Sequence, residues 1–445
     1  MGRAQDTAAK RSGKANETLL VAERDNCRTQ DDKLVRHLGQ QIQALYADKM
    51  KMDPKMSSDK LVLAIAVAIF ATGGAFAAEV PLTFFGTNMP SVDFHGFASQ
   101  GFMASTSYNY LDNDTAHGGS FRLSEAGLNA SMNPFPRTRI TAQAFTYDVG
   151  DDGDYDVVLD YASIEYTFND YIGIRAGRIR RPQGIYNDIQ DVDVARTFAL
   201  LPQGVYDARF RDFYLTLDGG ELFGDIPLNK AGDLSYEVYG GRVNPSLDGG
   251  AANRTRSDLP PFVQLDSIDP FEMAGMQLWW NTPVNGLRFG AAGGYIFDSA
   301  FHTTAFGIFH STTKASIPLF QGSAEYLWKS WTFQAEYGTD IQYPNPGISL
   351  RGDAWYASAA YRFNKWFETG AYYGEYYNDV SQREDSLQFQ KDAALALRFD
   401  PKDWWTLKIE GHYLHGTGLL DDDASNPVQN NNPWFMLVVK TTFSF

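Results

Sequence analysis

The sequence has almost no cysteine, and the only one, Cys27, lies near the N-terminus. The rest of the chain therefore has no disulfide framework and no thiol chemistry. A membrane-spanning helix is also missing, since it needs about 20 consecutive apolar residues and the longest apolar run, 61–71, has 11. GxSxG, HExxH and GxxxxGK[ST] motifs are absent as well. No catalytic residue, metal site or cofactor is expected from motifs of this kind.

The apolar run instead has the pattern of a secretory signal. Lys60 precedes it, and Ala75 and Ala77 form an Ala-x-Ala cleavage site. The sequence thus predicts a signal peptide over 56–77 and a mature protein that begins near Ala78. The alternative for the run is a buried core helix. Signal peptides stand at the start of a chain, so Met56 is the expected first residue, and 1–55 is expected to be a mis-started, non-native extension.

Charge excludes one class of partner. The chain has 38 Lys and Arg against 54 Asp and Glu, a formal net charge of −16. Because 12 of the basic and 9 of the acidic residues lie in 1–77, the remainder carries −19. Nucleic acids are bound through Lys and Arg contacts to phosphates. We therefore expect no nucleic-acid partner.

Polarity alternates along much of the chain after Ala78, most clearly on the two sides of Lys329. One face there carries Phe320, Gly322, Ala324, Tyr326, Trp328, Trp331, Phe333, Ala335 and Tyr337. The other carries Gln321, Ser323, Glu325, Thr332, Gln334 and Glu336. Period-two alternation predicts strands. The polar face is expected to be wet and the other to face lipid, with aromatic residues at the strand ends. In a soluble β-sandwich, the alternative, the large apolar residues would stand on the dry face.

Bulky aromatic residues also flank short turns repeatedly, as at Phe168–Tyr171, Trp328–Trp331, Phe363–Trp366 and Phe399–Trp404. Such pairs are typical of the interface girdle of a membrane barrel. The pattern predicts an all-β transmembrane antiparallel barrel over 78–445, with short turns at one end and long loops at the other. Sixteen strands are expected: 92–106, 119–132, 137–148, 155–168, 171–180, 208–218, 232–244, 272–281, 286–298, 318–328, 331–343, 353–363, 366–379, 390–399, 404–416 and 433–445.

The last predicted strand, 433–445, alternates Phe435, Leu437, Val439, Thr441, Phe443 and Phe445 with Met436, Val438, Lys440, Thr442 and Ser444, and the chain ends on Phe445. This ending resembles the terminal strand of Gram-negative outer-membrane β-barrels. The resemblance implies that Phe443 and Phe445 belong to a signal read by the barrel-assembly machinery. It also implies a location in the outer membrane, short periplasmic turns, long extracellular loops, and contact with lipid and lipopolysaccharide.

The third long loop, 181–207, follows the fifth predicted strand. With its flanks (177–207) it resembles the corresponding segment of trimeric 16-stranded porins and, more loosely, of phosphate-selective ones. The resemblance implies a loop that folds into the barrel as a constriction, and a homotrimer. Individual phosphate ligands do not match, so selectivity is not carried over.

The charges of this region split by sign, which is the pattern of a transverse field across a pore. The predicted constriction residues are Arg137, Arg139, Arg175, Arg178, Arg180, Arg181, Asp188, Asp191, Asp193 and Arg196. Apolar residues in the same loop are expected to pin it to a wall; alternatively, the charges only solvate an extracellular loop. Further lumen charges are expected at Arg288, Arg362, Arg398, Lys408, Lys440, Glu125, Glu165, Glu237, Glu325, Glu336 and Glu410.

These features together predict a porin, a water-filled channel for passive diffusion of small hydrophilic solutes or ions, without enzymatic activity. Arginines are concentrated in the first half of the barrel, so a preference for anions is expected. One alternative is a surface anchor or adhesin whose barrel is plugged by 181–207. A second is an outer-membrane barrel enzyme, and a third is a soluble secreted β-protein.

Overall fold

The structure is a computed structural model that describes residues 78–80, 83–84, 87–88, 90–150, 152–421, 426 and 431–445. The expected extension 1–55 and signal peptide 56–77 lie outside the described residues, and both stay predictions.

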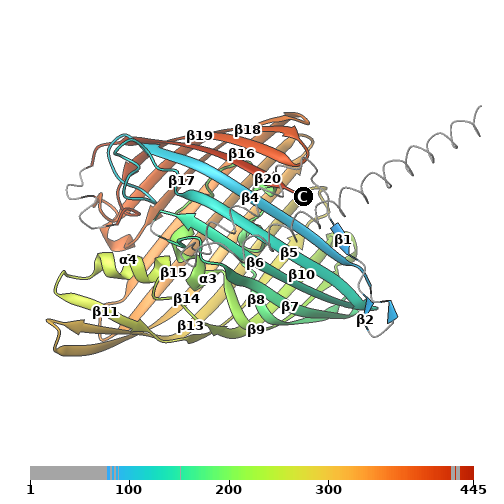
Figure 1. The fold of residues 1–445 in the computed structure, drawn as a ribbon, viewed down its shortest axis with the longest axis horizontal. Coiled ribbons are helices and arrows are strands. Elements are labelled where there is room, and N and C mark those ends of the chain that lie inside the picture. Colours follow the sequence, from blue (N-terminus) through green and yellow to red (C-terminus); the bar gives the residue numbers. More distant parts are fainter. Residues whose placement is uncertain are drawn as a thin grey trace, which may run out of the picture. The chain divides into compact units, whose positions relative to one another are not determined.

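Sixteen antiparallel strands close into a barrel (Figure 1). Every strand pairs with its neighbours along the chain, and the last strand pairs with the first. The all-β barrel predicted from the alternation is therefore confirmed. The strands are β4 (Val92–Ser105), β5 (Leu123–Phe135), β6 (Thr138–Val149), β7 (Val158–Asn169), β8 (Ile172–Arg180), β9 (Thr216–Pro227), β10 (Asp233–Val243), β12 (Phe271–Asn281), β13 (Leu287–Ala305), β14 (Phe309–Trp328), β15 (Trp331–Asn345), β16 (Leu350–Asn364), β17 (Phe367–Tyr377), β18 (Phe389–Lys402), β19 (Trp405–Gly416) and β20 (Trp434–Ser444).

Four further strands lie outside this ring. β11 (Val263–Ile268) pairs with the end of β13 and so prolongs the wall beyond β12. β1 (Ala78–Val80) pairs with the start of β4. β2 (Thr83–Phe84) and β3 (Thr87–Asn88) form a separate two-stranded sheet.

One end of the barrel has only tight connections, which we call the short-turn end. The two-residue turn at Lys329 and Ser330 is an example: Lys329 has a φ of 55°, the left-handed conformation that matches the twist of a hairpin. The other end, the long-loop end, has the connections 106–122, 150–157, 181–215, 244–270, 306–308, 346–349, 378–388 and 417–433.

Several of the expected boundaries are wrong. The predicted loop 299–317 is mostly strand, because β13 and β14 continue as a hairpin past the rim of the barrel. A strand that is surrounded by water carries polar residues on both faces, so its sequence does not alternate and resembles that of a loop. Similarly, most of 344–352 is strand. In contrast, 208–214 is not strand: it forms a 3₁₀ helix (Ala208–Phe210) and the short helix α3 (Arg211–Tyr214).

The two faces of the wall have the expected polarity. Inward side chains such as Gln321, Glu325 and Glu336 are buried by the loops inside the barrel. Outward side chains are apolar and exposed, for example Leu128, Ile164 and Leu437. Aromatic rings stack in groups at the short-turn end: Trp331 with Phe333, Trp366 with Phe399, and Trp404 with Phe443. This is the arrangement of a membrane-spanning barrel with an aromatic girdle.

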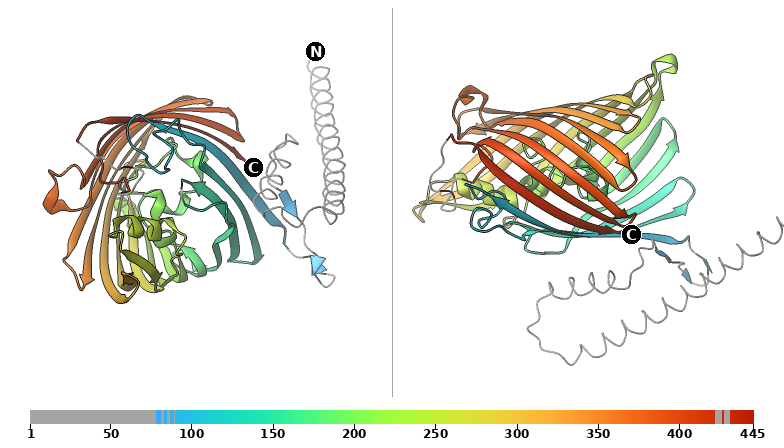
Figure 2. Two further views of the ribbon diagram at one scale, coloured as in Figure 1. Left: turned by 60° about the vertical axis from the view of Figure 1, so that its left-hand side comes forward. Right: turned by 90° about the horizontal axis from the view of Figure 1, so that it is seen from above.

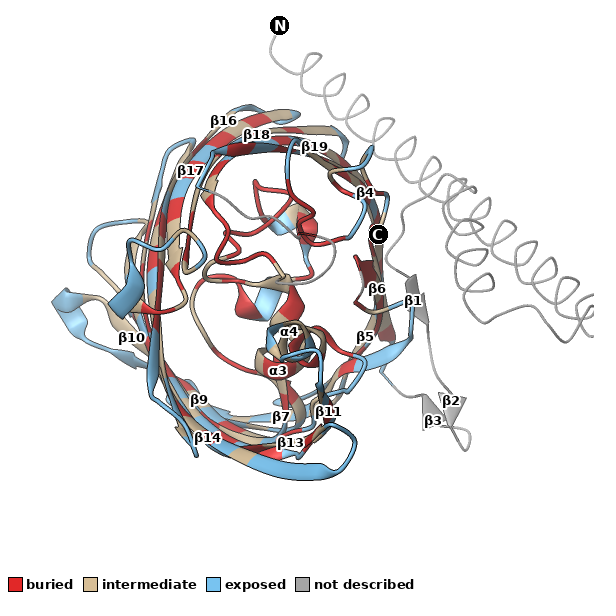
Figure 3. Cartoon of the chain, turned by 90° about the vertical axis from the view of Figure 1, so that its left-hand side faces the viewer, coloured by how far each residue is buried: buried red, intermediate tan, exposed pale blue. Residues whose placement is uncertain are grey.

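Helices occur only in connections of the described part of the chain. Besides α3, these are α4 (Gly250–Asp258) and the 3₁₀ helices Asn187–Ile189, Asp193–Ala195, Ala208–Phe210, Asn229–Ala231 and Val380–Gln382. None of the described helices has the length and hydropathy of a membrane-crossing helix. Seen from the long-loop end, α3, α4 and several loop segments lie inside the ring of strands, and many of their residues are buried (Figure 3). Two further views show the same enclosure from the side and from above (Figure 2).

Candidate channel constriction

The segment 181–215, which we call the inner loop, leaves the wall and crosses the interior of the barrel. The pairing of β7 with β8 ends at Ala162 and Arg178, although β8 continues to pair with β9 as far as Arg180 and Thr216. The chain therefore parts from β7 before it turns inward. Large apolar side chains of the loop are buried inside the barrel: Ile185, Tyr186, Phe198, Leu200, Leu201 and Tyr206.

Glu336 of β15 makes the first attachment of this loop. Its carboxylate accepts hydrogen bonds from the backbone N–H of Ile185 (2.9 Å) and from the hydroxyls of Tyr206 and Tyr356 (2.8 Å for Tyr356). Ser323 donates a further bond of 2.6 Å. A buried carboxylate is tolerated when its lone pairs are satisfied in this way.

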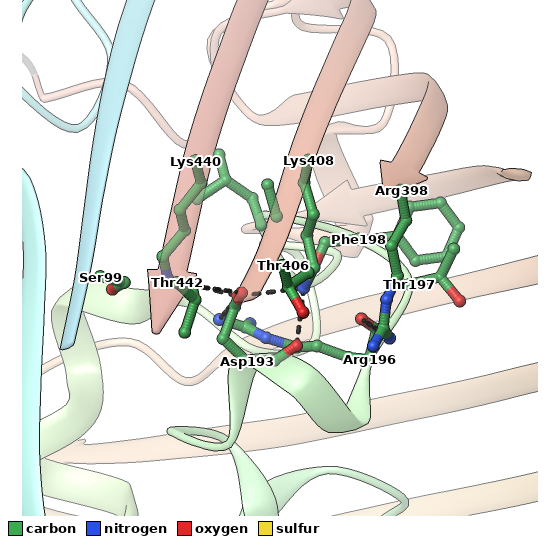
Figure 4. Close-up of polar contacts among 12 residues, drawn as sticks. Ser99, Asp193, Arg196, Thr197, Phe198, Arg398, Thr406, Lys408, Lys440 and Thr442 are labelled. Carbon is green, nitrogen blue, oxygen red and sulfur yellow. Dashed lines mark hydrogen bonds and ion pairs between the residues drawn. The ribbon is translucent and has the colours of Figure 1, made fainter. Parts of the chain in front are cut away.

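Asp193 makes the second attachment, at the middle of the loop (Figure 4). Its Oδ1 lies 3.0 Å from Lys408 Nζ and 3.4 Å from Lys440 Nζ, on the neighbouring strands β19 and β20. Arg196 and Thr442 complete the set at 3.2 and 2.8 Å. Burial by itself would raise the pKa of Asp193, but Lys408, Lys440 and Arg196 outweigh it and hold the pKa well below its usual range. The carboxylate is therefore charged.

Asp191 makes the third attachment, on the side of the barrel formed by β6 and β8. It forms ion pairs with Arg180 and Arg211 and accepts a hydrogen bond from Gln143 of β6 (3.1 Å). Asp160 of β7 pairs with the same two arginines. Burial opposes ionisation of Asp191, yet Arg211 and Arg180 hold its pKa well below the usual range.

Glu410 of β19 makes the fourth attachment. It accepts the backbone N–H of Ala199 at 2.7 Å, and His412 Nε2 lies 2.9 Å from its other oxygen. His412 Nδ1 lies 3.0 Å from Asp392. Next to this set, Arg398 donates to the carbonyl of Arg196 (3.0 Å). The loop is thus fixed to β15, β18, β19 and β20 as well as to its own side of the barrel.

Other loops pack on the inner loop from the long-loop end. Ala199 and Leu200 belong to one buried cluster with Tyr108, Tyr110 and Leu111 of the connection 106–122 and Leu419 and Leu420 of the connection 417–433. This packing narrows the lumen on that side of the inner loop.

A cavity of about 40 Å³ remains between the inner loop and the wall of β5, β6 and β20. A water molecule needs about 10–15 Å³ of such volume, so this space holds about three waters. We call it the eyelet. Its charged and polar lining consists of Arg196, Arg211, Lys440, Glu125, Gln190, Gln203, Tyr147 and Tyr206. Three cationic side chains and one carboxylate therefore line this cavity.

The opposite side of the inner loop faces the open part of the lumen. Asp188, Ile189 and Val192 are exposed there. Protein atoms nevertheless surround Asp188, and this confinement raises its pKa to about 6 against the opposing effects of Arg175 and Arg180. Arg175 itself bridges Glu165 (3.0 Å) and Glu221 (2.9 Å) on the wall.

The predicted constriction residues lie in three different places. Arg180, Asp191, Asp193 and Arg196 fasten the inner loop, and Arg181 donates to the carbonyl of Tyr214 at its root (2.7 Å). Arg139, Arg175 and Asp188 lie on the lumen surface. Arg137 and Arg178 lie elsewhere: Arg137 is in the turn before β6, where it donates to Phe168 O (2.6 Å), and Arg178 pairs with Asp218 at 2.8 Å. Ile179 and Leu217, the residues that alternate with this pair, are buried in the interior, so Arg178 faces outward.

Several residues of the constriction were not predicted as part of it. Lys408, Lys440, Glu336 and Glu410 were expected in the lumen, but nothing in the sequence joins them to a loop about 150 or more positions away. Arg211 was expected in a strand. The charged residues Arg209, Arg211 and Asp212 around it do not follow a period of two. This was the available sign of an irregular segment. Within the described residues no group of three or more His, Cys, Asp or Glu side chains is arranged to hold a metal ion.

The sequence matches no protein-family model and no curated protein. Its fold, however, matches solved structures. The outer-membrane-expressed OmpT of Vibrio cholerae aligns over 82% of this chain and 100% of its own, with a TM-score of 0.52 and 13% identity. The anion-selective porin from Comamonas acidovorans aligns over 80% of this chain and 99% of its own, with a TM-score of 0.51 and 11% identity. An in-vitro folded OmpT of Vibrio cholerae, described as a trimer form, aligns over 80% of this chain and 100% of its own. The TM-score is 0.52 and the identity 12%. At these identities the likeness concerns the fold, which is that of outer-membrane porins.

Proposed function

We propose that the chain is an outer-membrane porin, a passive channel for water, ions and small hydrophilic solutes. The eyelet carries this proposal. The barrel encloses a loop that is attached to the wall on several sides, and a cavity of about 40 Å³ with charged and polar residues in its lining remains beside it. A loop that served only to fill the barrel would have no reason to leave charged side chains around a cavity, because each carries a desolvation cost.

The wall of the barrel supports the proposed membrane location. A closed ring of strands satisfies every backbone N–H and C=O in lipid, and the exposed apolar band and aromatic stacks face outward. The short-turn end then faces the periplasm and the long-loop end the outside, as in bacterial barrels. Lipid, lipopolysaccharide and the barrel-assembly machinery are the proposed partners. A homotrimer is proposed in line with the V. cholerae trimer form.

Selectivity follows from the eyelet lining. Arg196, Arg211 and Lys440 stand against Glu125 there, and a ring dominated by one sign of charge favours counter-ions of the other sign. The nearby Asp191 and Asp193 reduce this excess, so the proposed preference for anions is modest.

Bilayer recordings test the proposal. The purified protein is inserted into a planar lipid bilayer under a KCl gradient. Stepwise ohmic currents with a reversal potential on the anion side are expected. A reversal potential on the cation side would overturn the selectivity, and absence of current from a folded, heat-modifiable barrel would overturn the channel.

A plugged surface anchor remains the second candidate. The apolar cluster that joins the inner loop to Leu111, Leu419 and Leu420 fills much of one end of the lumen. In that case the same recordings would be silent. Calcein-loaded vesicles would also retain their dye after insertion of the protein.

A further inference from the structure

Helix α4 lies in the connection 244–270 and occupies the long-loop end of the barrel (Figure 1). It rests directly on the root of the inner loop. A Cβ atom placed on Gly250 would lie 2.1 Å from the carbonyl oxygen of Arg209, and one on Gly249 would lie 2.0 Å from Asp212 Oδ2. Only glycine permits this approach, so the start of α4 is fitted against 209–212.

The stretch under α4 also lines the eyelet. Ala208 and Arg211 belong to the eyelet lining, and Arg209 and Asp212 alternate with them along the chain. One side of this single segment therefore bounds the eyelet while the other side carries α4. A displacement of α4 would free the outer side of the segment that sets the eyelet width.

Polar contacts hold α4 in this position. Arg254 donates to Asp421 Oδ1 at 3.2 Å, and Arg209 donates to the same oxygen at 2.9 Å. Asn253 donates to Asp152 Oδ1 at 2.7 Å. We call these contacts the latch. It ties α4 to three other connections, which carry Asp152, Arg209 and Asp421.

Apolar burial contributes little to the same attachment. The buried apolar side chains of α4 are those of Ala251 and Ala252, and alanine removes little apolar surface from water. The inner loop differs, since it buries Phe198, Leu200 and Leu201. The inner loop is therefore the fixed element, whereas α4 depends on a few polar contacts. Chain breakers adjoin it on both sides: Gly249 stands before it, and Pro260 and Pro261 follow it.

We propose that α4 is a gate over the extracellular mouth, closed by the Asp421 latch, and that it swings away to widen the passage beyond the three-water eyelet. This gate rests on the proposed channel function. In the closed position Arg209 and Arg254 share Asp421. Opening breaks these charge-assisted hydrogen bonds and exposes the two buried alanines.

Two readouts on the full-length chain test the gate. The first is the rate at which a water-soluble maleimide modifies Ala252→Cys, made in a Cys27→Ser background. Ala252 is fully buried next to Leu265 and Ile268, so the thiol reacts when α4 lifts. The second readout is single-channel conductance in a planar bilayer.

Asp421→Asn removes the charge that Arg209 and Arg254 share. We expect the labelling rate and the open probability to rise about tenfold, because a charged hydrogen-bond partner contributes more than a neutral one. Glu384→Gln is the matched control: it removes one exposed carboxylate from another long-loop connection, outside the latch. This control is expected to behave as the parent protein.

The outcomes separate the gate from the channel. Unchanged labelling and conductance in Asp421→Asn would overturn the gate while currents from the parent protein would sustain the channel. Faster labelling without any current would support a mobile α4 and overturn the channel. An equal effect of Glu384→Gln would also overturn the latch, since general surface charge would then explain the change.

Discussion

Asp193 of the inner loop and Lys408 of β19 form an ion pair of 3.0 Å in which neither side chain exposes more than 1% of its surface. Lys408 also donates to the carbonyls of Asp193 and Phe198 at 2.7 and 3.0 Å. One lysine thus satisfies both the side chain and the backbone of the loop. The pair places the middle of the inner loop against the wall.

Asp193→Asn is expected to loosen this attachment. It leaves the buried cations of Lys408 and Lys440 without their shared carboxylate, and removing one partner of a buried ion pair costs about 3–5 kcal/mol. Single-channel currents should become larger and noisier, and proteolysis of the inner loop should accelerate. Asp218→Asn is the control, because Asp218 pairs with Arg178 on the outer side of the wall, where both side chains are partly exposed. Such a pair contributes about 0–1 kcal/mol. Identical currents from the two variants would contradict the anchoring role.

Asp188 is expected to make the ion selectivity depend on pH. Its pKa is raised to about 6, so the carboxylate is charged at neutral pH and loses its charge as the pH falls through about 6. Acidification removes a negative charge from the lumen and should shift the reversal potential toward anions. Asp188→Asn should show the acidic value throughout. A variant that keeps the parent pH dependence would assign the titration to another group.

Gly184→Ala tests the attachment at Glu336. Gly184 has a φ of 63°, and a Cβ there would lie 2.1 Å from Gln321 Nε2. The left-handed conformation costs a non-glycine residue about 1–2 kcal/mol, and the crowding adds to this cost beside the Glu336 network. The single-channel current should become noisier, because the inner loop is held less firmly. Gly307→Ala is the matched control, because Gly307 has a φ of 70° and a Cβ there would have no atom within 4 Å. This variant should leave the current unchanged.

The strand plan could be predicted from the sequence because lipid and water impose opposite polarity on the two faces of the wall. Alternation assigns residues such as Glu325, Glu336 and Lys440 to the inside, and their contacts confirm it. Alternation fails outside the membrane. The extension of β13 and β14 carries His302, Thr303 and Thr304, whose polarity does not alternate, so the pattern there is typical of a loop although the segment is strand.

The attachments of the inner loop could not be predicted, because they are a matter of three-dimensional pairing. Arg178 and Arg180 are two residues apart, yet Arg178 faces outward to Asp218 and Arg180 reaches inward to Asp191. The difference arises where β8 ends and the chain bends away from the wall. Opposed rows of charge were expected, whereas Arg180, Asp191, Asp193 and Arg196 pair within the loop attachments. Their effect on ion selection stays a prediction.

The end of the chain gives a prediction about assembly. Phe445 exchanges two backbone hydrogen bonds with Gly96, of 2.9 and 3.1 Å, and its ring covers the place where a Gly96 side chain would be. Gly96→Val should displace the Phe445 ring and lower the yield of folded barrel, measured as heat-modifiable migration on a gel. Gly411→Val adds the same side chain to another barrel strand, where no atom lies within 4 Å, and should fold normally. Equal yields would show that the Phe445 position is unimportant for closure.

Asp152 gives the gate a predicted pH dependence. Burial raises its pKa to about 7, although the hydrogen bond from Asn253 and the charge of Arg209 act in the opposite direction, and Asp212 and Asp421 reinforce the rise. In an open state, where Asp152 meets water, its pKa returns toward about 3.9. The closed state therefore binds the proton more tightly, and its advantage is complete below about pH 4 and lost as the pH rises through about 7. Asp212, whose pKa burial raises to about 6, acts in the same sense.

The channel should accordingly open more often at about pH 8 than at about pH 5. Asp152→Asn resembles the protonated carboxyl and can still accept the hydrogen bond from Asn253. At about pH 8 its gate should be closed more often than that of the parent protein. The slope of open probability against pH should fall to the part that Asp212 contributes. Open probability is measured at zero salt gradient, so that the selectivity change from Asp188 does not enter. If Asp152→Asn retained the full slope of the parent protein, the proton that closes the gate would bind elsewhere.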